Sequence, residues 1–400
     1  MSPLIVRRSS RDSTKSTAGD FRLLELALYF LRLGTFGFGG PIALVGYMQK
    51  DLVEERGWFS KEDYLQGLAF CQLSPGPLAA QLAIYLGWLR AGVLGGTLTG
   101  ITFILPSFMM VVVLAAFYVR FGSLPWIQGV FYGGGAAVIA IIARSAVKLV
   151  RTTLSQDWLL WIVFAAMTIS TAWKESEIVW LFVVCGILVM LIKAPPKAKS
   201  LAATAPFPAS FGQLITGVHG IATLGTVGAL FLFFVKAGAF VFGSGLAIVP
   251  FLYGGVVGRF HWLTERQFVD AVAVAMITPG PIIITAGFIG YLVAGVVGAI
   301  AAAFAVFAPP YFFVLLVAPY YRRFASNPQV KAFVKGVTAA AVGAIAGAAF
   351  ILARRSLIDV TTVLIAVGTF VMLTLTKKIP EPLLIVAAGV IGMFFHGNPR

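Results

Sequence analysis

The stretch Ser74-Pro75-Gly76-Pro77 recurs 204 residues later as Thr278-Pro279-Gly280-Pro281. Two prolines around a glycine cannot continue an ordinary helix, because proline lacks an N–H donor and restricts the residue before it. The Ser or Thr that precedes them supplies a hydroxyl suited to capping a helix end. Long apolar runs flank both stretches. Each stretch therefore predicts a helix that is interrupted within an apolar environment.

A second interruption obeys the same offset. Residues 36–41 read FGFGGP, and residues 240–245 read FVFGSG. Glycine permits a positive φ and a close approach between backbones, and Pro41 stops the helix before it. Each half of the chain is thus predicted to contain two broken helices.

The matches extend along the whole chain and predict a duplication. Trp58 maps onto Trp262 at the offset of 204, and Pro106 maps onto Pro309 at an offset of 203. So many ordered matches are not expected by chance, and internal repeats define the fold class when they occur. The expected parts are a basic tail at 1–20, a first membrane repeat at 21–192, a proline-rich linker at 193–212 and a second membrane repeat at 213–400.

The composition excludes a soluble protein. Of the 400 residues, 59% are hydrophobic and 11% are charged. A water-soluble domain cannot bury that many apolar side chains, because its surface still needs polar and charged side chains. We therefore expect an all-α polytopic membrane protein with about 10–12 membrane segments.

The formal net charge of +15 does not indicate nucleic acid. The Lys and Arg residues lie between apolar runs, as they do in loops on the cytoplasmic side of a bilayer. The expected location is a bacterial inner (plasma) membrane that the chain crosses several times. The expected partners are the lipid bilayer and a small anion, with no nucleic acid, and a homodimer is left open.

The distribution of cations favours an inverted repeat. In the first half, cations follow the fourth apolar segment, whereas in the second half they precede the corresponding segment. A shift of the positive bias to the opposite end of the same helix is what inversion requires. The cations concerned are Arg144, Lys148 and Arg151 in the first half, and Arg322, Arg323, Lys331 and Lys335 in the second.

The four breaks predict a binding site for an anion. A helix that starts inside the membrane presents unpaired N–H groups and the positive end of its dipole. Broken helices related by a repeat can direct several such ends at one point. The competing interpretation is that glycine and proline only kink packed helices. The candidate site residues in the breaks are Gly39, Gly40, Pro41, Ser74, Pro75, Gly76, Pro77, Gly243, Ser244, Gly245, Thr278, Pro279, Gly280 and Pro281.

Several polar side chains near the breaks are further candidates. Arg32 and its counterpart Lys236 could neutralise a bound anion, or their side chains could extend to the membrane interface. Gln81 and Thr285 match each other and could hydrogen-bond an oxyanion or bridge two helices. Asp270 leads into the second Pro-Gly-Pro stretch and could carry a coupling proton or pair with a cation.

Other patterns point to packing or to no chemistry. Gly92, Gly96 and Gly100 are spaced by four residues and predict a small-residue helix contact. The sequence contains no phosphate-binding Gly-x-x-x-x-Gly-Lys loop and no His-Glu-x-x-His pair. The expectation is transport driven by a gradient, with no cofactor, no metal and no enzymatic activity, because an enzyme would need a cluster of His, Cys or carboxylate side chains.

These residues resemble a known family. The runs FGFGGP, RGWFSKEDY and LAFCQLSPGPLAAQLAIYLGWLRAGVLGG are similar to the first domain of the bacterial chromate ion transporters. The runs FVKAGAFVFGSG, FHWLTERQF, DAVAVAMITPGP and TAGFIGYLVAG are similar to the second. The chain departs from the family pattern at Ala79 and Ala80, where small hydroxyl residues are usual, and at Ser244, which interrupts the glycine run.

The resemblance implies a secondary transporter that exports chromate, driven by the membrane potential or by exchange with sulfate. By matching motif positions, the resemblance implies that the functional residues are Gly39 to Pro41, Pro75 to Pro77 and Gln81 in the first half, and Gly243, Gly245 and Thr278 to Pro281 in the second. Chromate and sulfate share charge and shape, so the alternatives are transport or uptake of sulfate or another oxyanion, and a passive anion channel.

Overall fold

The computed structural model of the chain is all-helical in the part that it describes. That part comprises residues 21–38, 40–174, 179–195, 224–241, 245, 248–321, 327–376 and 379–396, and it contains no strand. The all-α fold expected from the sequence is confirmed. The basic tail, most of the linker and the candidate residues Gly39, Gly243 and Ser244 lie outside the described residues.

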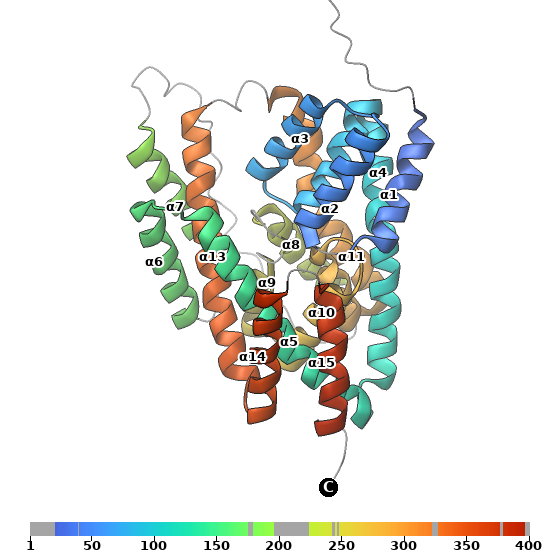
Figure 1. Cartoon of the computed structure of the whole chain (residues 1–400), viewed down its shortest axis with the longest axis vertical. Helices are drawn as coiled ribbons and strands as arrows, with labels where there is room; N and C mark the ends of the chain where they lie inside the picture. Colours follow the sequence, from blue (N-terminus) through green and yellow to red (C-terminus); the bar gives the residue numbers. More distant parts are fainter. Residues whose placement is uncertain are drawn as a thin grey trace, which may run out of the picture.

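Both repeats contain the same order of helices (Figure 1). The first repeat consists of α1 (Leu23–Phe36), α2 (Gly40–Met48), the π-helical turn η1 (Gln49–Glu55), α3 (Lys61–Leu73), α4 (Leu78–Phe121), α5 (Pro125–Thr153), α6 (Trp158–Lys174) and α7 (Val179–Lys193). The second consists of α8 (Leu224–Ala239), α9 (Ile248–Leu252), η4 (Tyr253–Arg259), α10 (Glu265–Ile277), η5 (Ile282–Ile284), α11 (Thr285–Val317), η6 (Ala318–Tyr320), α13 (Pro328–Ser356), α14 (Val360–Leu375) and α15 (Glu381–His396).

The repeats match even in an unusual backbone conformation. Inside α4, Gly92 has φ 58° and ψ −143°, and inside α11 Gly295 has φ 62° and ψ −151°. Residues with a Cβ rarely adopt these angles, because the Cβ clashes with the backbone. Glycine is therefore required where each helix bends sharply. The expectation that Gly92 packs on a helix face is therefore wrong, because Gly92 is the pivot of a kink. Gly96 does pack closely, since a Cβ there would lie 3.1 Å from the carbonyl oxygen of Ile84.

The two repeats run in opposite directions, as the charge distribution predicts. Arg355, at the end of α13, pairs with Glu265 at the start of α10. The next residue, Arg266, donates through Nη2 to the carbonyl oxygen of Gln128 at 3.2 Å, near the start of α5. The end of α13 and the start of its counterpart α5 therefore lie together. Figure 1 shows α14, α15 and the C-terminus at this same lower end of the molecule.

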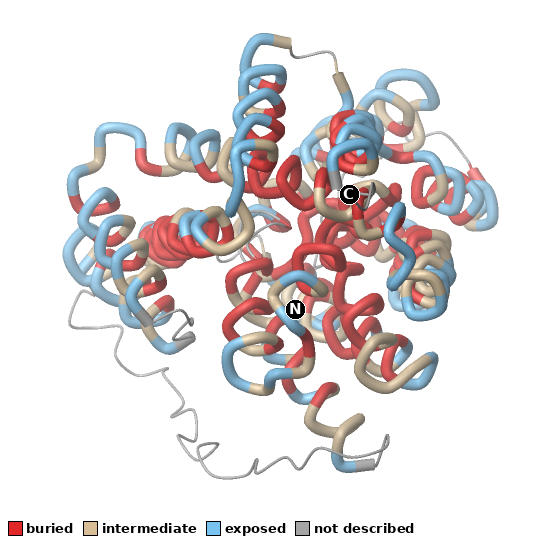
Figure 2. Tube along the Cα trace, turned by 90° about the horizontal axis from the view of Figure 1, so that it is seen from below, coloured by how far each residue is buried: buried red, intermediate tan, exposed pale blue. Residues whose placement is uncertain are grey.

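The last two helices of each repeat pack on the other repeat. A Cβ at Gly343 of α13 would lie 2.5 Å from the carbonyl oxygen of Phe164 in α6. In the same way, a Cβ at Gly133 of α5 would overlap the carbonyl oxygen of Ala388 in α15. These glycines let the helix backbones touch. The repeats are thus interlocked, and buried residues gather where they meet (Figure 2).

The helices are apolar enough for the predicted membrane fold. Among the described residues, four helices are both long and apolar enough to span a membrane, within Leu78–Phe121, Pro125–Thr153, Ile282–Tyr320 and Pro328–Ser356. Shorter apolar helices accompany them, including α6, α7, α14 and α15. The polytopic architecture with broken helices is therefore confirmed.

Equivalent positions in the two repeats should be reached from opposite sides of the membrane. Leu124 is the N-cap of α5, and Asn327 is the N-cap of α13. We expect a membrane-impermeant maleimide to label Leu124→Cys and Asn327→Cys from opposite faces, in a background in which Cys71 and Cys185 are replaced by Ala. Intact cells and everted vesicles provide the two faces. Labelling of both cysteines from the same face would contradict inversion.

Candidate functional site

The broken helices of one repeat are hydrogen-bonded to those of the other. The backbone N–H of Gly76 donates to the carbonyl oxygen of Val241 at 2.6 Å. The N–H of Gly280 donates to the carbonyl oxygen of Gly37 at 3.1 Å. Because the offset of 204 relates Gly76 to Gly280 and Gly37 to Val241, the two bonds are symmetric copies. We call the region around these four residues the junction.

Glycine is required at both donors. Gly76 has φ 137° and Gly280 has φ 99°, which side chains rarely adopt. A Cβ at Gly76 would lie 2.5 Å from the Cβ of Pro310, and one at Gly280 would overlap the Oγ of Ser107. Pro310 and Ser107 are themselves counterparts, so each Pro-Gly-Pro turn is pressed against the long kinked helix of the other repeat.

The second pair of breaks also reaches the junction. A Cβ at Gly245 would lie 3.9 Å from the Cγ of Pro41 and 3.6 Å from the Cβ of Ile282. Gly40, where α2 begins, has φ 72°. The structure therefore brings together stretches from all four breaks, two from each repeat.

The hydroxyl groups at the breaks donate hydrogen bonds to nearby backbone carbonyl groups in the same segment. Ser74 Oγ donates to the carbonyl oxygen four residues earlier at 2.7 Å. Thr278 and Thr285 each donate to the carbonyl three residues earlier, at 3.0 and 2.7 Å. All three side chains are buried. Their hydroxyl protons are therefore engaged, which leaves backbone N–H groups and cations as donors for an anion.

Gln81 shapes the first Pro-Gly-Pro turn. Its side chain is fully buried, and Nε2 donates to the carbonyl oxygen of Pro75 at 2.6 Å. Its Oε1 has no hydrogen-bond partner within the part of the chain that the structure describes. The amide thus closes the turn around Gly76, and direct contact between Gln81 and an oxyanion stays a prediction.

The charged candidates occupy different environments. Arg32 on α1 and Lys236 on α8 are exposed, on equivalent positions of these two helices. Neither lines the cavity described below, and their predicted action on a bound anion stays a prediction. Asp270 is 3% exposed, and its Oδ2 accepts a hydrogen bond from Tyr118 Oη at 2.8 Å. Asp270 therefore links α10 of the second repeat to α4 of the first.

A small cavity opens at the junction. Its volume is ≈ 20 Å³, and its lining includes Gly37, Gly40, Thr278 and Gly280. A site of this size holds about one water molecule, so a polyatomic anion can enter only if the surrounding helices move apart. The junction is thus closed in this conformation.

Glu381 also lines this cavity, and the sequence analysis did not select it. It is the first residue of α15, and its Oε1 lies 4.0 Å from Nη1 of Arg144 on α5. A lone carboxylate between Pro380 and Pro382, at the start of the last apolar run, was the signal available in the sequence. The ion pair itself depends on contact between two repeats and could not be read from it.

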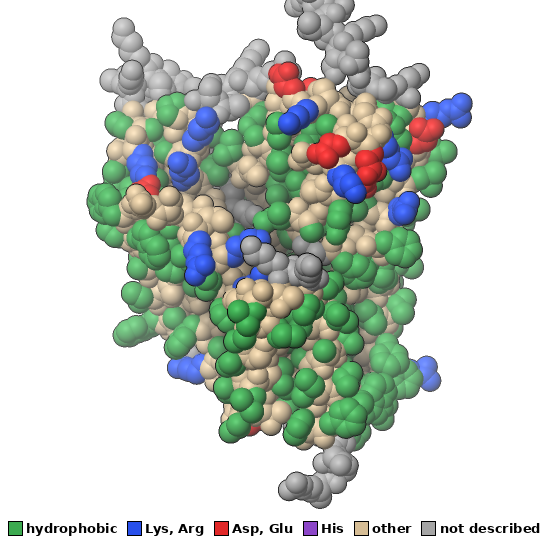
Figure 3. Space-filling view, viewed as in Figure 1, with side chains coloured by type: hydrophobic (Ala, Val, Ile, Leu, Met, Phe, Trp, Pro, Cys, Tyr) green, Lys and Arg blue, Asp and Glu red, His purple; other side chains and the backbone are tan. Residues whose placement is uncertain are grey.

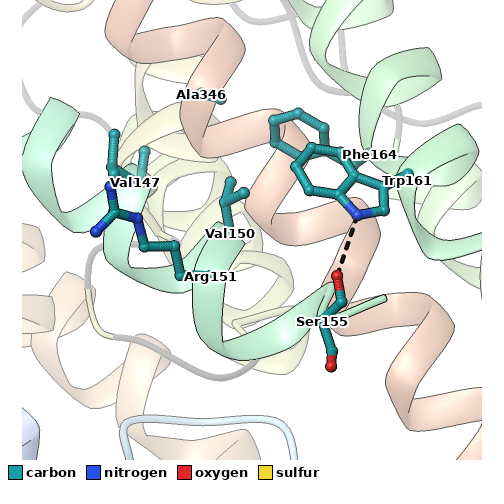
Figure 4. A pocket seen from close by; sticks show the side chains of 8 residues that line it. Val147, Val150, Arg151, Ser155, Trp161, Phe164 and Ala346 are labelled. Carbon is teal, nitrogen blue, oxygen red and sulfur yellow. Dashed lines mark hydrogen bonds between the residues drawn. The ribbon is translucent and has the colours of Figure 1, made fainter. Parts of the chain in front are cut away.

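A larger cavity lies elsewhere. It measures ≈ 490 Å³ and lies between α5, α6 and α13, lined mainly by apolar side chains such as Val147, Val150 and Phe164. Figure 4 shows Arg151 at this pocket and the hydrogen bond of 3.3 Å from Trp161 Nε1 to the carbonyl oxygen of Ser155. No residue of the interrupted stretches lines this pocket. Its size alone therefore does not make it the site.

Comparison with known proteins identifies the family. The family described as Chromate transporter matches residues 24–190 and matches again at residues 228–393, so each repeat carries one copy. No solved structure matches the chain. The chain belongs to the chromate transporter family.

Similar curated proteins span almost the whole chain. A Chromate transport protein from Cupriavidus metallidurans is 54% identical over 94% of this chain and 94% of its own length. A Probable chromate transport protein from Synechococcus elongatus is 53% identical over 94% of this chain and 96% of its own. A Chromate transport protein from Pseudomonas aeruginosa is 30% identical over 94% of this chain and 92% of its own.

The close packing at the junction predicts that a substitution of Gly280 destabilises the protein. Gly280→Ala combines a positive φ with overlap on Ser107, so we expect the free energy of unfolding to fall by at least about 2 kcal/mol. Gly46→Ala is the matched control, because a Cβ at Gly46 of α2 would meet no atom within 4 Å. Denaturant unfolding of the purified protein in detergent measures both. Equal stability of the two variants would show that the junction is not tightly packed.

Proposed function

We propose that this transporter moves chromate out of the cytoplasm across the bacterial inner membrane, driven by the membrane potential or by exchange with sulfate. The observation that carries the proposal is the 54% identity, over 94% of both chains, with a protein named Chromate transport protein. That similarity includes the family match to both repeats. The geometry of the junction supplies a physical reason for an anionic substrate.

A dianion that leaves water needs several donors. Transfer of an unpaired charge into an apolar medium is very costly, and charge-assisted hydrogen bonds offset the cost. At the junction, α4 begins directly after Pro77. The helix that follows Pro281 begins with η5 and continues as α11. Both starts carry N–H groups without an intrahelical partner and the positive end of a helix dipole, which favour an anion.

Inverted repeats offer a route for alternating access. Two similar halves that face opposite ways can exchange conformations, so that one fixed site opens first to one side and then to the other. The reciprocal bonds from Gly76 and Gly280 give each half an equivalent contact to break or keep. The cavity of ≈ 20 Å³ is too small for a polyatomic anion, so the helices around it would have to move apart during transport.

Asp270 is the proposed coupling residue. Its carboxylate is buried and bonded to Tyr118 across the interface between the repeats. The counterpart position in the first repeat is Gln66, which cannot carry a proton in this way. A single titratable group at a moving interface can bind a proton in one conformation and release it in the other.

Transport by everted vesicles tests the proposed function. We expect saturable chromate uptake into everted vesicles that contain the protein, increased by an inside-positive potential, by a proton gradient or by sulfate inside. Vesicles without the protein give the background. Uptake that only follows the chromate gradient would indicate a channel, and sulfate uptake unaffected by chromate would indicate a different substrate.

The role of Asp270 has its own test. We expect Asp270→Asn to retain chromate–sulfate exchange, because Asn can still accept the bond from Tyr118, but to lose stimulation by a proton gradient. Glu62→Gln on α3 is the control, since Glu62 is exposed. An unchanged response of Asp270→Asn to the proton gradient would remove Asp270 from the coupling mechanism.

A further inference from the structure

Three cations follow one face of α5. Arg144, Lys148 and Arg151 are spaced by four and three residues, which places them on one side of a helix over about 10 Å. Arg144 is half-buried, with a side chain 30% exposed, and Lys148 and Arg151 are exposed. Figure 3 shows Lys and Arg side chains on the face of the molecule where α5 and α13 lie. The cations thus form a graded series from the surface to the ion pair with Glu381.

Glu381 connects this series to the junction. It lines the same cavity as Thr278 and Gly280, and its Oε1 lies 4.0 Å from Nη1 of Arg144. Lys148 lies about one helical turn beyond Arg144 on the same side of α5. A carboxylate that lines the cavity between the broken helices is therefore also next to the cation Arg144, where a transported anion would be stabilised.

The arrangement is not needed to hold α15 on α5. These helices already touch through glycines, since a Cβ at Gly129 would lie 2.7 Å from the Cα of Met393. An ion pair at 4.0 Å is also looser than the 2.7–2.9 Å of a strong charge-assisted bond. A partner could therefore replace Glu381 at Arg144 without separating the two helices.

Two of the three cations also break the symmetry of the repeats, whereas Arg151 corresponds to another cation, Arg354, at the offset of 203. At the offset of 203, Arg144 and Lys148 of α5 correspond to Gly347 and Ile351 of α13. In the second repeat, α13 packs in the corresponding place with these uncharged residues. The packing that the two repeats share therefore does not account for the charges of Arg144 and Lys148.

We propose that Arg144 and Lys148 hold the transported dianion beside the junction, and that Glu381 is a tethered carboxylate which occupies these cations when no anion is bound. The inference rests on the proposed function and names residues for that same site. An arriving dianion competes with Glu381, because it carries two charges and can accept from both cations and from the backbone N–H groups. When the dianion leaves, Glu381 returns to Arg144, so the half-buried guanidinium is not left without a negative partner inside the membrane.

Binding of chromate and of sulfate to the purified protein tests this inference. We expect Glu381→Gln to lower the Kd about tenfold, because the competing carboxylate is gone, and Arg144→Gln to raise it by at least about tenfold. Arg120→Gln at the end of α4 is the matched control and should leave the Kd unchanged. If Arg144→Gln does not fold, Lys148→Gln provides the second measurement, with a smaller rise in Kd and a weaker dependence on salt.

The outcomes separate the inference from the proposed function. A wild-type protein that binds neither chromate nor sulfate would overturn both. A wild-type protein that binds them, with the same Kd for Glu381→Gln, would overturn the tethered competitor. Weaker binding by Glu381→Gln would also overturn it, since Glu381 would then support the site. An unchanged Kd for Arg144→Gln or Lys148→Gln would remove these cations from the site.

Discussion

A backbone N–H or C=O group inside a membrane must find a partner, and this requirement controls the centre of the molecule. The Pro-Gly-Pro turns end the helices there and release their backbone groups. The structure pairs them across the repeats, Gly76 with Val241 and Gly280 with Gly37. Both hydrogen bonds join one repeat to the other. The inverted arrangement and the interlocking of the two repeats therefore satisfy the backbone groups that the breaks release.

The same arrangement supports the proposed anion site. Helix starts that are not fully capped carry N–H groups and a dipole field, and they meet next to a cavity large enough for one water molecule. The surrounding helices approach each other closely at small residues such as Gly34, Ser107 and Gly280. A site of this kind can open by breaking one of two equivalent bonds. In the proposed empty state, the Glu381 carboxylate pairs with Arg144 in place of the transported anion.

The sequence was informative wherever a local rule applied. The stretches at 74–77 and 278–281 revealed the breaks, and the cations around Arg144 indicated inversion, because proline chemistry and charge bias act locally. It could not show which break pairs with which, since Gly76 and Val241 lie far apart in the chain. The prediction that Gly92 forms a helix contact was wrong, because a spacing of four residues gives no sign that the helix is kinked at Gly92. Glu381 was missed because its partner belongs to the other repeat.

The position of a bound oxyanion tests the central claim most directly. Chromium scatters X-rays anomalously, so crystals grown with chromate would locate the metal atom without reference to side-chain density. We expect one chromium peak at the junction, between the Thr278–Gly280 turn and Arg144, with Glu381 turned away. A peak in the pocket between α5, α6 and α13, with the junction unchanged, would contradict the claim that the broken helices form the site.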